Sequence, residues 1–465
     1  STLHNTLFPY TTLFRSLGLR ERLGSVVRIK RFKCRARPVP TPLTRNPPVS
    51  VPPSTELTTQ AIIDRHDAYL SPNYPRWPMA MVRGEGAWLW DAEGGEYLDL
   101  FAGFGGALLG HCHPELVRAV TDQASTLWHV GNLLHTDPQT RLAQHIAEAG
   151  FGGQSFFCHS GADANEAALK LARLYGQANP GPDGPRYKFI SAHGSFHGRS
   201  FGTMPATGQD KAREGFDPLP TGYAQVPFND MAALEQAVDS QTVAIILEPI
   251  QGEGGVNVPG EDYLAQVRQL CDARDLLLIF DEVWTGGGRT GRMFAHQHWG
   301  VSPDMMSLAK GVGGGLPVGV MCARPEIANL YDARQHGVKH ATTLGGNCIA
   351  MAAGAAVFEV VQRDGLDERA AALGQRAIDQ LSDFSRKYET VREVRGRGLF
   401  LGLKLEPDSP AASFESAGEV VTRCRARGLL INATQGNVLR LAPPLTIGEA
   451  ELDRGLAMLE EAIAE

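Results

Sequence analysis

The sequence predicts an α/β protein with a large domain, whose mostly parallel sheet is covered by helices, and a smaller α+β domain. Helical patterns alternate with short, unbroken apolar runs through the middle of the chain, as in a sheet buried on both faces. Residues 356–465 change to helices mixed with strand-like runs. The length of 465 residues, 43% of them hydrophobic, allows two or three domains.

Residues 1–53 differ from the rest of the chain in charge. They carry ten Lys or Arg and one acid, whereas the whole chain has a net charge of −7. An Arg-rich targeting peptide is one interpretation, but crowded prolines exclude a single amphipathic helix. Residues 6–16 read like a translated sequencing adapter. We therefore expect residues 1–53 to be a non-native or disordered basic tail, with the natural start near Ser54.

Composition excludes several functional classes. The body of the chain is acidic, which argues against nucleic acid as a partner. No apolar run reaches the ~18 residues of a membrane span, so we expect no membrane association. Seven scattered cysteines form no disulfide framework and favour a reducing, cytoplasmic location.

Residues 54–103 are expected to pack with the small domain. Between residues 79 and 100, alternating Met81, Trp88 and Trp90 occupy strand-like runs, and residues 91–95 have turn composition. This pattern predicts a hairpin. It needs a partner surface, because neither this segment nor the C-terminal one makes a complete core alone.

Residues 104–355 form the predicted large domain. Helical patterns cover 114–125 and 140–150. The apolar runs that we predict as buried strands are 155–158, 188–191, 243–247 and 276–280.

Residues 356–465 form the predicted small domain. Thr446 and Glu449 have the spacing of a capping box that starts the last helix. The other expected elements are helices 365–388 and 417–427 and strands 391–394, 399–405, 429–432 and 438–441.

Two polar residues follow predicted strands of the large domain. Asp281 ends the run 276–280, at the strand end where α/β proteins bind ligands, although it could also cap the next turn. Lys310 follows the apolar run 305–309 and precedes a glycine run. A partly desolvated lysine amine is suited to Schiff-base chemistry. The same sequence pattern is also compatible with an ordinary surface lysine in a loop.

A candidate phosphate site lies at residues 160–170. Small residues open a helix there, directly after the strand ending at Cys158. Free N–H groups and the helix dipole favour an anion, although a plain strand-to-helix turn with a serine cap is commoner. A phosphate site, an aspartate and a lysine at different strand ends together fit pyridoxal 5′-phosphate.

From about Tyr74 to the C-terminus, the sequence resembles the class III (subgroup II) aminotransferases, which are pyridoxal-phosphate enzymes of fold type I. Within that family it is most similar to the enzymes of acetylornithine and ornithine. The resemblance rests on several motifs in the family's order, at residues 110–114, 157–170, 195–199, 248–255, 281–283, 288–291, 310, 342–347 and 394–398.

The resemblance implies roles for the cofactor site. Lys310 would hold the cofactor covalently and then shuttle the proton, and Asp281 would pair with the ring nitrogen. The remaining cofactor contacts that it implies are Gly161 and Ala162 at the phosphate, Val283 and Phe196 on the two ring faces, Trp284 near the phenolic oxygen, and Thr343 at the phosphate of a neighbouring subunit. A homodimer with shared active sites follows from the last of these.

The resemblance also implies substrate contacts. Arg199 and Arg440 would bind carboxylates, because a planar guanidinium can donate two parallel hydrogen bonds to a carboxylate. Glu253 would neutralise Arg440 when no second carboxylate is present. Tyr74 and Thr342 match further substrate contacts of the family.

Several residues depart from the family pattern. Trp284 replaces the usual glutamine, Thr342 the usual serine and Leu344 the usual aromatic residue, and 104–109 is unusually apolar. These changes bear on the amino donor. We therefore expect an aminotransferase that moves an amino group, best from N2-acetylornithine, to 2-oxoglutarate by a ping-pong mechanism. The alternatives are an ω-amino acid aminotransferase of the 4-aminobutyrate or β-alanine type, and a decarboxylase or mutase on the same fold.

A metal site is not expected. His111, Cys112 and His113 stand too close together for a tetrahedral zinc site, and no second Cys/His pair follows at finger spacing.

Overall fold

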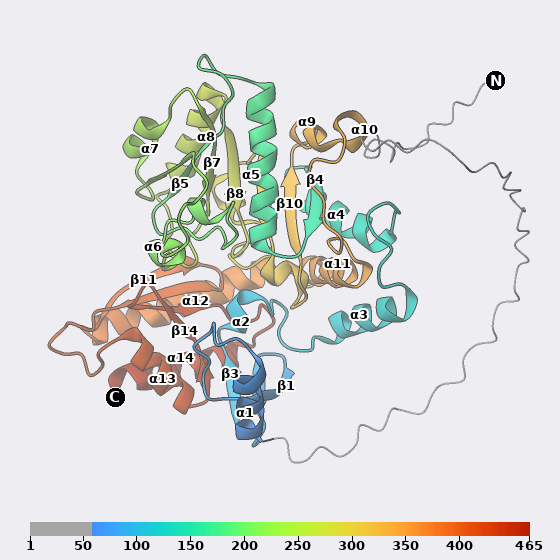
Figure 1. Ribbon diagram of the computed structural model, residues 1–465. Helices are drawn as coiled ribbons and strands as arrows, with labels where there is room; N and C mark the ends of the chain where they lie inside the picture. The colour runs from blue at the N-terminus through green and yellow to red at the C-terminus, as the bar shows by residue number, and fades with distance from the viewer. Residues whose placement is uncertain (1–57) are drawn as a thin grey trace, which may run out of the picture. The chain divides into compact units, whose positions relative to one another are not determined.

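The computed structural model describes residues 58–465 (Figure 1). The predicted tail 1–53 and its adapter-like stretch 6–16 lie outside the described residues. No helix of the described part is long and apolar enough to cross a membrane.

A seven-stranded sheet forms the centre of the large domain, with strand order β4-β10-β9-β8-β7-β5-β6. Only β10 runs antiparallel to its neighbours, which confirms the mostly parallel sheet. The strands are β4 (Gln154–Cys158), β5 (Lys188–Ala192), β6 (Tyr223–Val226), β7 (Thr242–Leu247), β8 (Leu277–Asp281), β9 (Met305–Leu308) and β10 (Gly319–Ala323).

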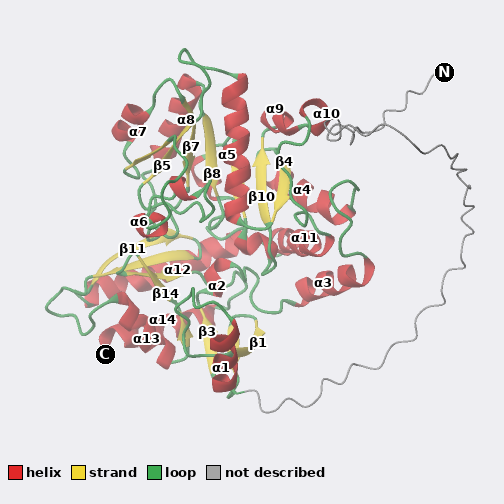
Figure 2. Ribbon diagram, viewed as in Figure 1, coloured by secondary structure: helices red, strands yellow, loops and turns green. Residues whose placement is uncertain are grey.

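Helices cover both faces of this sheet, as Figure 2 shows. Every residue of β7 is buried. Its Ala244 and Ile246 pack in one cluster with α5 (Gly161–Ala178), and its Ile245 and Leu247 pack in another with α8 (Tyr263–Arg274). Burial on both faces explains why the strand is an unbroken apolar run.

The remaining helices of this half also follow the predicted patterns. The patterns 114–125 and 140–150 correspond to α3 and α4, each of which begins with proline in its first turn. The helices are α2 (Ala102–Gly105), α3 (Pro114–Thr126), α4 (Asp137–Ala149), α6 (Asp210–Arg213), α7 (Met231–Ala237), α9 (Pro325–Ala328), α10 (Ala333–His336) and α11 (Cys348–Arg363).

The N-terminal segment begins with α1 (Thr59–Tyr69) and continues as three strands, one more than the predicted hairpin has. These are β1 (Met81–Glu85), β2 (Trp88–Asp91) and β3 (Glu96–Asp99). An additional reversal at Gly86, which has a φ of 57°, separates β1 from β2. β3 pairs in parallel with β13 (Leu429–Leu430), so this segment does join the C-terminal part of the chain.

A second four-stranded sheet has the order β11-β12-β15-β14. Its strands are β11 (Val391–Arg397), β12 (Phe400–Leu405), β14 (Asn432–Thr434) and β15 (Val438–Leu441), and the predicted strand 429–432 is thus divided between two sheets. The helices α12 (Leu366–Lys387), α13 (Ala417–Ala426) and α14 (Glu449–Ala464) complete this part.

The predicted capping box at Thr446 is wrong. The N-cap of α14 is Gly448, whose N–H donates to the Glu451 carboxylate at 2.8 Å. Thr446 instead donates its hydroxyl to the Leu109 carbonyl, because a tertiary partner lies closer than the helix end.

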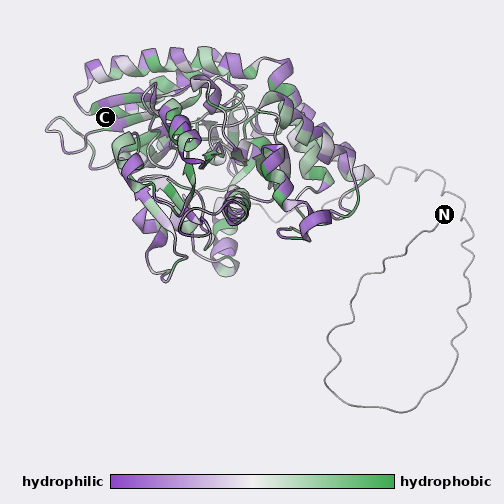
Figure 3. Cartoon of the chain, turned by 90° about the horizontal axis from the view of Figure 1, so that it is seen from above, coloured by the Kyte–Doolittle hydropathy of each residue, from purple (hydrophilic) through white to green (hydrophobic). Residues whose placement is uncertain are grey.

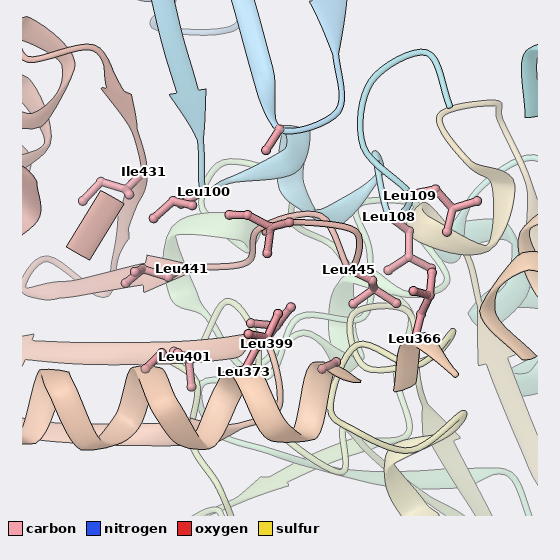
Figure 4. Packing of buried hydrophobic residues seen from close by; sticks show 14 of the residues in the cluster. Leu100, Leu108, Leu109, Leu366, Leu373, Leu399, Leu401, Ile431, Leu441 and Leu445 are labelled. Carbon is pink, nitrogen blue, oxygen red and sulfur yellow. The ribbon is translucent and has the colours of Figure 1, made fainter. Parts of the chain in front are cut away.

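One large apolar cluster joins the C-terminal elements to the segments around residues 100 and 108. Figure 4 shows Leu373 of α12 beside Leu399 and Leu401, and Leu108 near Leu445. The helices at the rim alternate hydrophilic and hydrophobic residues (Figure 3), as expected where one helix face is solvated and the other packed. The division into 54–103, 104–355 and 356–465 stays a proposal, and α11 runs across its second boundary.

Candidate active site

A cavity of about 510 Å³ lies at the carboxyl ends of β4, β8 and β9. Strand ends of an open α/β sheet are the usual place for a ligand. The sequence-predicted site residues that line this cavity are Gly161, Ala162, Phe196, Arg199, Asp281, Val283, Trp284 and Lys310.

The first turn of α5 forms one end of the cavity. Ser160 caps the helix by accepting a hydrogen bond from the Asp163 N–H, and its carbonyl accepts from the Ala164 N–H. The N–H groups of Gly161 and Ala162 precede these bonds and remain available to a ligand. A phosphate is favoured there by the N–H groups and by the helix dipole together.

Asp281 forms the polar floor of the cavity and is almost completely buried. One carboxylate oxygen accepts from the Asn165 amide at 2.7 Å and lies 2.8 Å from His197 Nδ1. The other accepts from the Val283 N–H at 3.0 Å. Ser307 Oγ donates to Asn165 Oδ1 at 2.5 Å. This network fixes the carboxylate in a single orientation.

Glu248 is a second buried carboxyl group beside this network. Burial raises its pKa to about 7, with nearby Asp281 acting in the same direction and His197 against it. Its oxygens accept from the N–H groups of Phe196 and Gly252. Sequence reasoning assigned no role to Asn165, His197 or Glu248. All three lie inside the motifs that carry the family resemblance, which was the available signal.

Lys310 faces the cavity from the turn after β9. Its φ of 48° lies in the left-handed region, which is costly for a residue with a Cβ atom; such residues are enriched at functional sites. Burial lowers the pKa of its amine to about 8, although Glu253 and Asp281 oppose the shift. A larger fraction of the amine is therefore neutral, and able to act as a nucleophile, than in an ordinary lysine.

Val283 and Phe196 contribute apolar side chains to the lining of the cavity. Val283 lies against the start of α5, where a Cβ atom at Gly161 would be 2.8 Å from Val283 Cγ2. Phe196 contributes a ring, and the Arg199 guanidinium lies 5.3 Å from its centroid.

Arg440 and Glu253 form the ion pair that the resemblance implies. Arg440 Nη1 donates to Glu253 Oε1 at 2.9 Å, and Arg440 Nε donates to Asn432 Oδ1 at 3.3 Å. Burial acts to raise the pKa of Glu253, but Arg440, Lys310 and Trp284 outweigh it and hold the pKa below its usual range. Both residues of the pair contact Trp284, and neither lines the cavity.

Besides Arg440 and Glu253, three further predicted site residues lie outside the cavity. Thr342 Oγ1 is 3.3 Å from Nε2 of His159, which lines the cavity. Thr343 and Tyr74 are exposed and do not line it.

His111 has a partner other than a metal. Its Nε2 lies 2.8 Å from a carboxylate oxygen of Asp99, a buried residue at the end of β3. The interaction ties the loop after α2 to β3.

The family model for the class-III aminotransferases matches residues 69–463. The chain belongs to the class-III aminotransferases. It is 46% identical to the acetylornithine aminotransferase of Caldanaerobacter subterraneus subsp. tengcongensis over 85% of this chain and 98% of that protein. It is 42% identical to the acetylornithine aminotransferase of Methanocaldococcus jannaschii over 87% of this chain and 98% of that protein.

Solved structures place this aminotransferase in the same family. The ornithine aminotransferase of Toxoplasma gondii superimposes with a TM-score of 0.81 and 31% identity, over 88% of this chain and 95% of that one. The acetylornithine aminotransferase of Elizabethkingia anophelis gives a TM-score of 0.75 and 31% identity, over 87% and 99%. The fold expected from the sequence is confirmed.

Pyridoxal 5′-phosphate is the cofactor of this family, and the T. gondii enzyme was crystallised with partial occupancy of it. The residues of this aminotransferase fit the group. The helix N-terminus offers N–H donors for the phosphate, and the buried Asp281 carboxylate would hold a protonated ring nitrogen. When bound, the cofactor supplies an electron sink for breaking the bonds at the amino-bearing carbon.

Proposed function

We propose that this aminotransferase takes the amino group of N2-acetylornithine and delivers it to 2-oxoglutarate in two alternating half-reactions. The donor is supported by curated relatives with 40–46% identity, which are named acetylornithine aminotransferases. The acceptor is supported by one observation above all, the ion pair between buried Arg440 and half-buried Glu253 beside Lys310. The Arg440 guanidinium can bind either the Glu253 carboxylate or the second carboxylate of a substrate. This suits a site that must accept both an acetylated amino acid and a dicarboxylate.

In this proposal each site residue has a specific role. Lys310 holds the cofactor and moves the proton, Asp281 keeps the ring nitrogen protonated, and Gly161 and Ala162 bind the phosphate. Val283, Phe196 and Trp284 enclose the ring. Substrates are bound by Arg199, Arg440, Thr342 and Tyr74, with Glu253 as the partner of Arg440 in the absence of a second carboxylate.

A donor panel with 2-oxoglutarate tests the assignment. Purified enzyme is assayed with acetylornithine, ornithine, 4-aminobutyrate and β-alanine, and carbon dioxide release is measured in parallel. The proposal expects acetylornithine to give the highest kcat/KM. A higher value for 4-aminobutyrate or β-alanine would favour an ω-amino acid enzyme, and release of carbon dioxide would favour a decarboxylase.

Arg440→Ala is expected to lower kcat/KM for 2-oxoglutarate by roughly 10- to 100-fold, because a charge-assisted hydrogen bond contributes ~1.5–3 kcal/mol. Cofactor binding should change little, since Arg440 does not line the cavity. Steady-state kinetics of each half-reaction measures the effect. Equal losses for every substrate, or loss of the bound cofactor, would show that the pair is structural.

Glu253→Ala is expected to favour the dicarboxylate substrate, whereas Arg440→Ala disfavours it. Without its partner, the Arg440 guanidinium is free to bind a dicarboxylate. The ratio of kcat/KM for glutamate to that for acetylornithine should therefore rise. The same half-reaction kinetics measures this ratio, and a fall in it would contradict the role given to the pair.

We also propose a homodimer with shared sites, in which Thr343 reaches the partner's phosphate. Leu133 is 98% exposed and Leu344 is 52% exposed, on two loops joined by a hydrogen bond from the Asn132 amide to the Thr342 carbonyl. Exposed apolar side chains gathered on adjoining loops mark an interaction surface.

Leu133→Lys tests the dimer. The variant is expected to sediment as a monomer and to lose activity in parallel, because each site would lack Thr343 of its neighbour. Sedimentation velocity and the standard assay measure the two effects. A fully active monomer would contradict shared sites.

A cytoplasmic location is proposed on cysteine usage alone.

A further inference from the structure

The Trp284 indole contacts both Lys310 and Arg440. Lys310, on the cavity side, has its Nζ 4.1 Å from the centroid of the indole ring. Arg440 has its guanidinium carbon 4.3 Å from the same ring and is completely buried. Trp284 lines the cavity and Arg440 does not. A ligand in the cavity can therefore contact the indole, whereas the guanidinium next to it is not exposed to the cavity.

Two glycines and a phenyl ring form a slot that fits this indole. A Cβ atom at Gly105 would lie 2.6 Å from Trp284 Cζ3, and one at Gly252 would lie 2.4 Å from Trp284 Cδ1. Phe400 of β12 stacks on the indole, with ring centroids 5.1 Å apart and an interplanar angle of 17°. Any side chain larger than glycine at either position would displace the indole, so its place is built into the surrounding backbone.

The indole also holds the ion pair together. Trp284 Nε1 donates to Glu253 Oε1 at 3.1 Å, and Arg440 Nη1 donates to the same oxygen at 2.9 Å. Arg440 Nη2 is buried and has no hydrogen-bond partner within the described chain. A buried guanidinium with one unpaired nitrogen retains the capacity to bind a further carboxylate oxygen, once that oxygen can reach it.

We propose that Trp284 is a specificity-determining residue, a cover over Arg440 that disfavours ligands with a second carboxylate. The inference rests on the proposed function, in which Arg440 receives that carboxylate. A neutral acylated side chain packs against the indole as it stands. A dicarboxylate must displace the indole and Glu253 first, so its apparent affinity is reduced by the fraction of molecules in which the cover is open.

The test compares two unreactive probes, glutarate and pentanoate, which have the same chain length and differ in one carboxylate. Isothermal titration calorimetry on the holoenzyme gives their dissociation constants. If the open form is populated at 10% or less, Trp284→Gln should raise the preference for glutarate over pentanoate by about tenfold or more. Trp284→Phe is the matched control. It keeps an aromatic ring over Arg440, although that ring is smaller than the indole and lacks the N–H, so its preference should stay within about threefold of that of the original enzyme.

Gly252→Ala provides a second route to the same state. It leaves Trp284 in the sequence but forces the indole from its slot, and it should also raise the preference for glutarate. An unchanged or lower preference in whichever of Trp284→Gln and Gly252→Ala is folded overturns the proposal. An equal rise in Trp284→Phe overturns it too, because the ring is still present there.

The probes do not react, so the result is independent of the amino donor. Absence of turnover with acetylornithine would contradict the proposed function without changing the glutarate-to-pentanoate ratios. Conversely, full turnover with acetylornithine and unchanged ratios in the variants would contradict the role of Trp284 as a cover and leave the proposed function intact.

Discussion

Lys310→Ala is expected to abolish transamination. The variant lacks the amine that holds the cofactor, and it also lacks the group that moves the proton. General acid–base catalysis alone contributes ~10²–10⁴-fold, and the covalent attachment is lost in addition. The measurement is the initial rate with saturating donor and 2-oxoglutarate, in the absence of added amines.

Lys188→Ala is the matched control for this experiment. Lys188 begins β5 at the opposite end of the sheet from the cavity, where it pairs with Asp239. Its loss should leave the rate nearly unchanged. If Lys310→Ala retained more than a few per cent of the activity while binding the cofactor normally, the assignment of Lys310 would be wrong.

Asp281→Asn is expected to reduce kcat by roughly 10²–10³-fold, the usual cost of removing one preorganised electrostatic partner. The amide keeps the size of the side chain but cannot hold a proton on the ring nitrogen of the cofactor. It also places an NH₂ group where the Asn165 amide and His197 now converge. Single-turnover kinetics and the visible spectrum of the bound cofactor report the loss.

Asp304→Asn controls for the cost of changing a buried aspartate. Asp304 is buried too, but it pairs with Arg268 and accepts from the Leu278 N–H near the beginning of β8, away from the cavity. Its variant can lose stability while each folded molecule keeps its rate. Comparable losses of kcat per folded enzyme in both variants would argue against a special role for Asp281.

The sequence predicted most of the central sheet because its strands are buried on both faces. β7 and β8 are buried throughout, and apart from Thr242 and Asp281 at their ends they have no polar positions to interrupt the apolar run. The division of residues 429–432 between two sheets could not be predicted. Which neighbour a short strand chooses depends on elements far away in the chain, here Leu98 of β3 for Leu429.

The site was predictable to the extent that each residue ends a strand or opens a helix. Asp281 and Lys310 were found in this way. His197 and Glu248 were not assigned, because each lies in a polar loop motif and its burial follows only from tertiary packing. The slot that holds Trp284 could not be predicted from the sequence either. It depends on Gly105 and Gly252, and no local pattern relates either glycine to the tryptophan.

The pairing of β3 with β13 has a consequence for biosynthesis. Leu98 of β3 pairs with Leu429 of β13, 331 residues later in the chain. At a synthesis rate of about 5–20 residues per second, the first strands emerge from the ribosome about 20 to 70 seconds before that partner is made. During this interval β3 has an unpaired edge, which could pair with other chains. Expression at lower temperature, or with a chaperone that binds exposed strands, should therefore increase the yield of native enzyme more than changes near the cavity would.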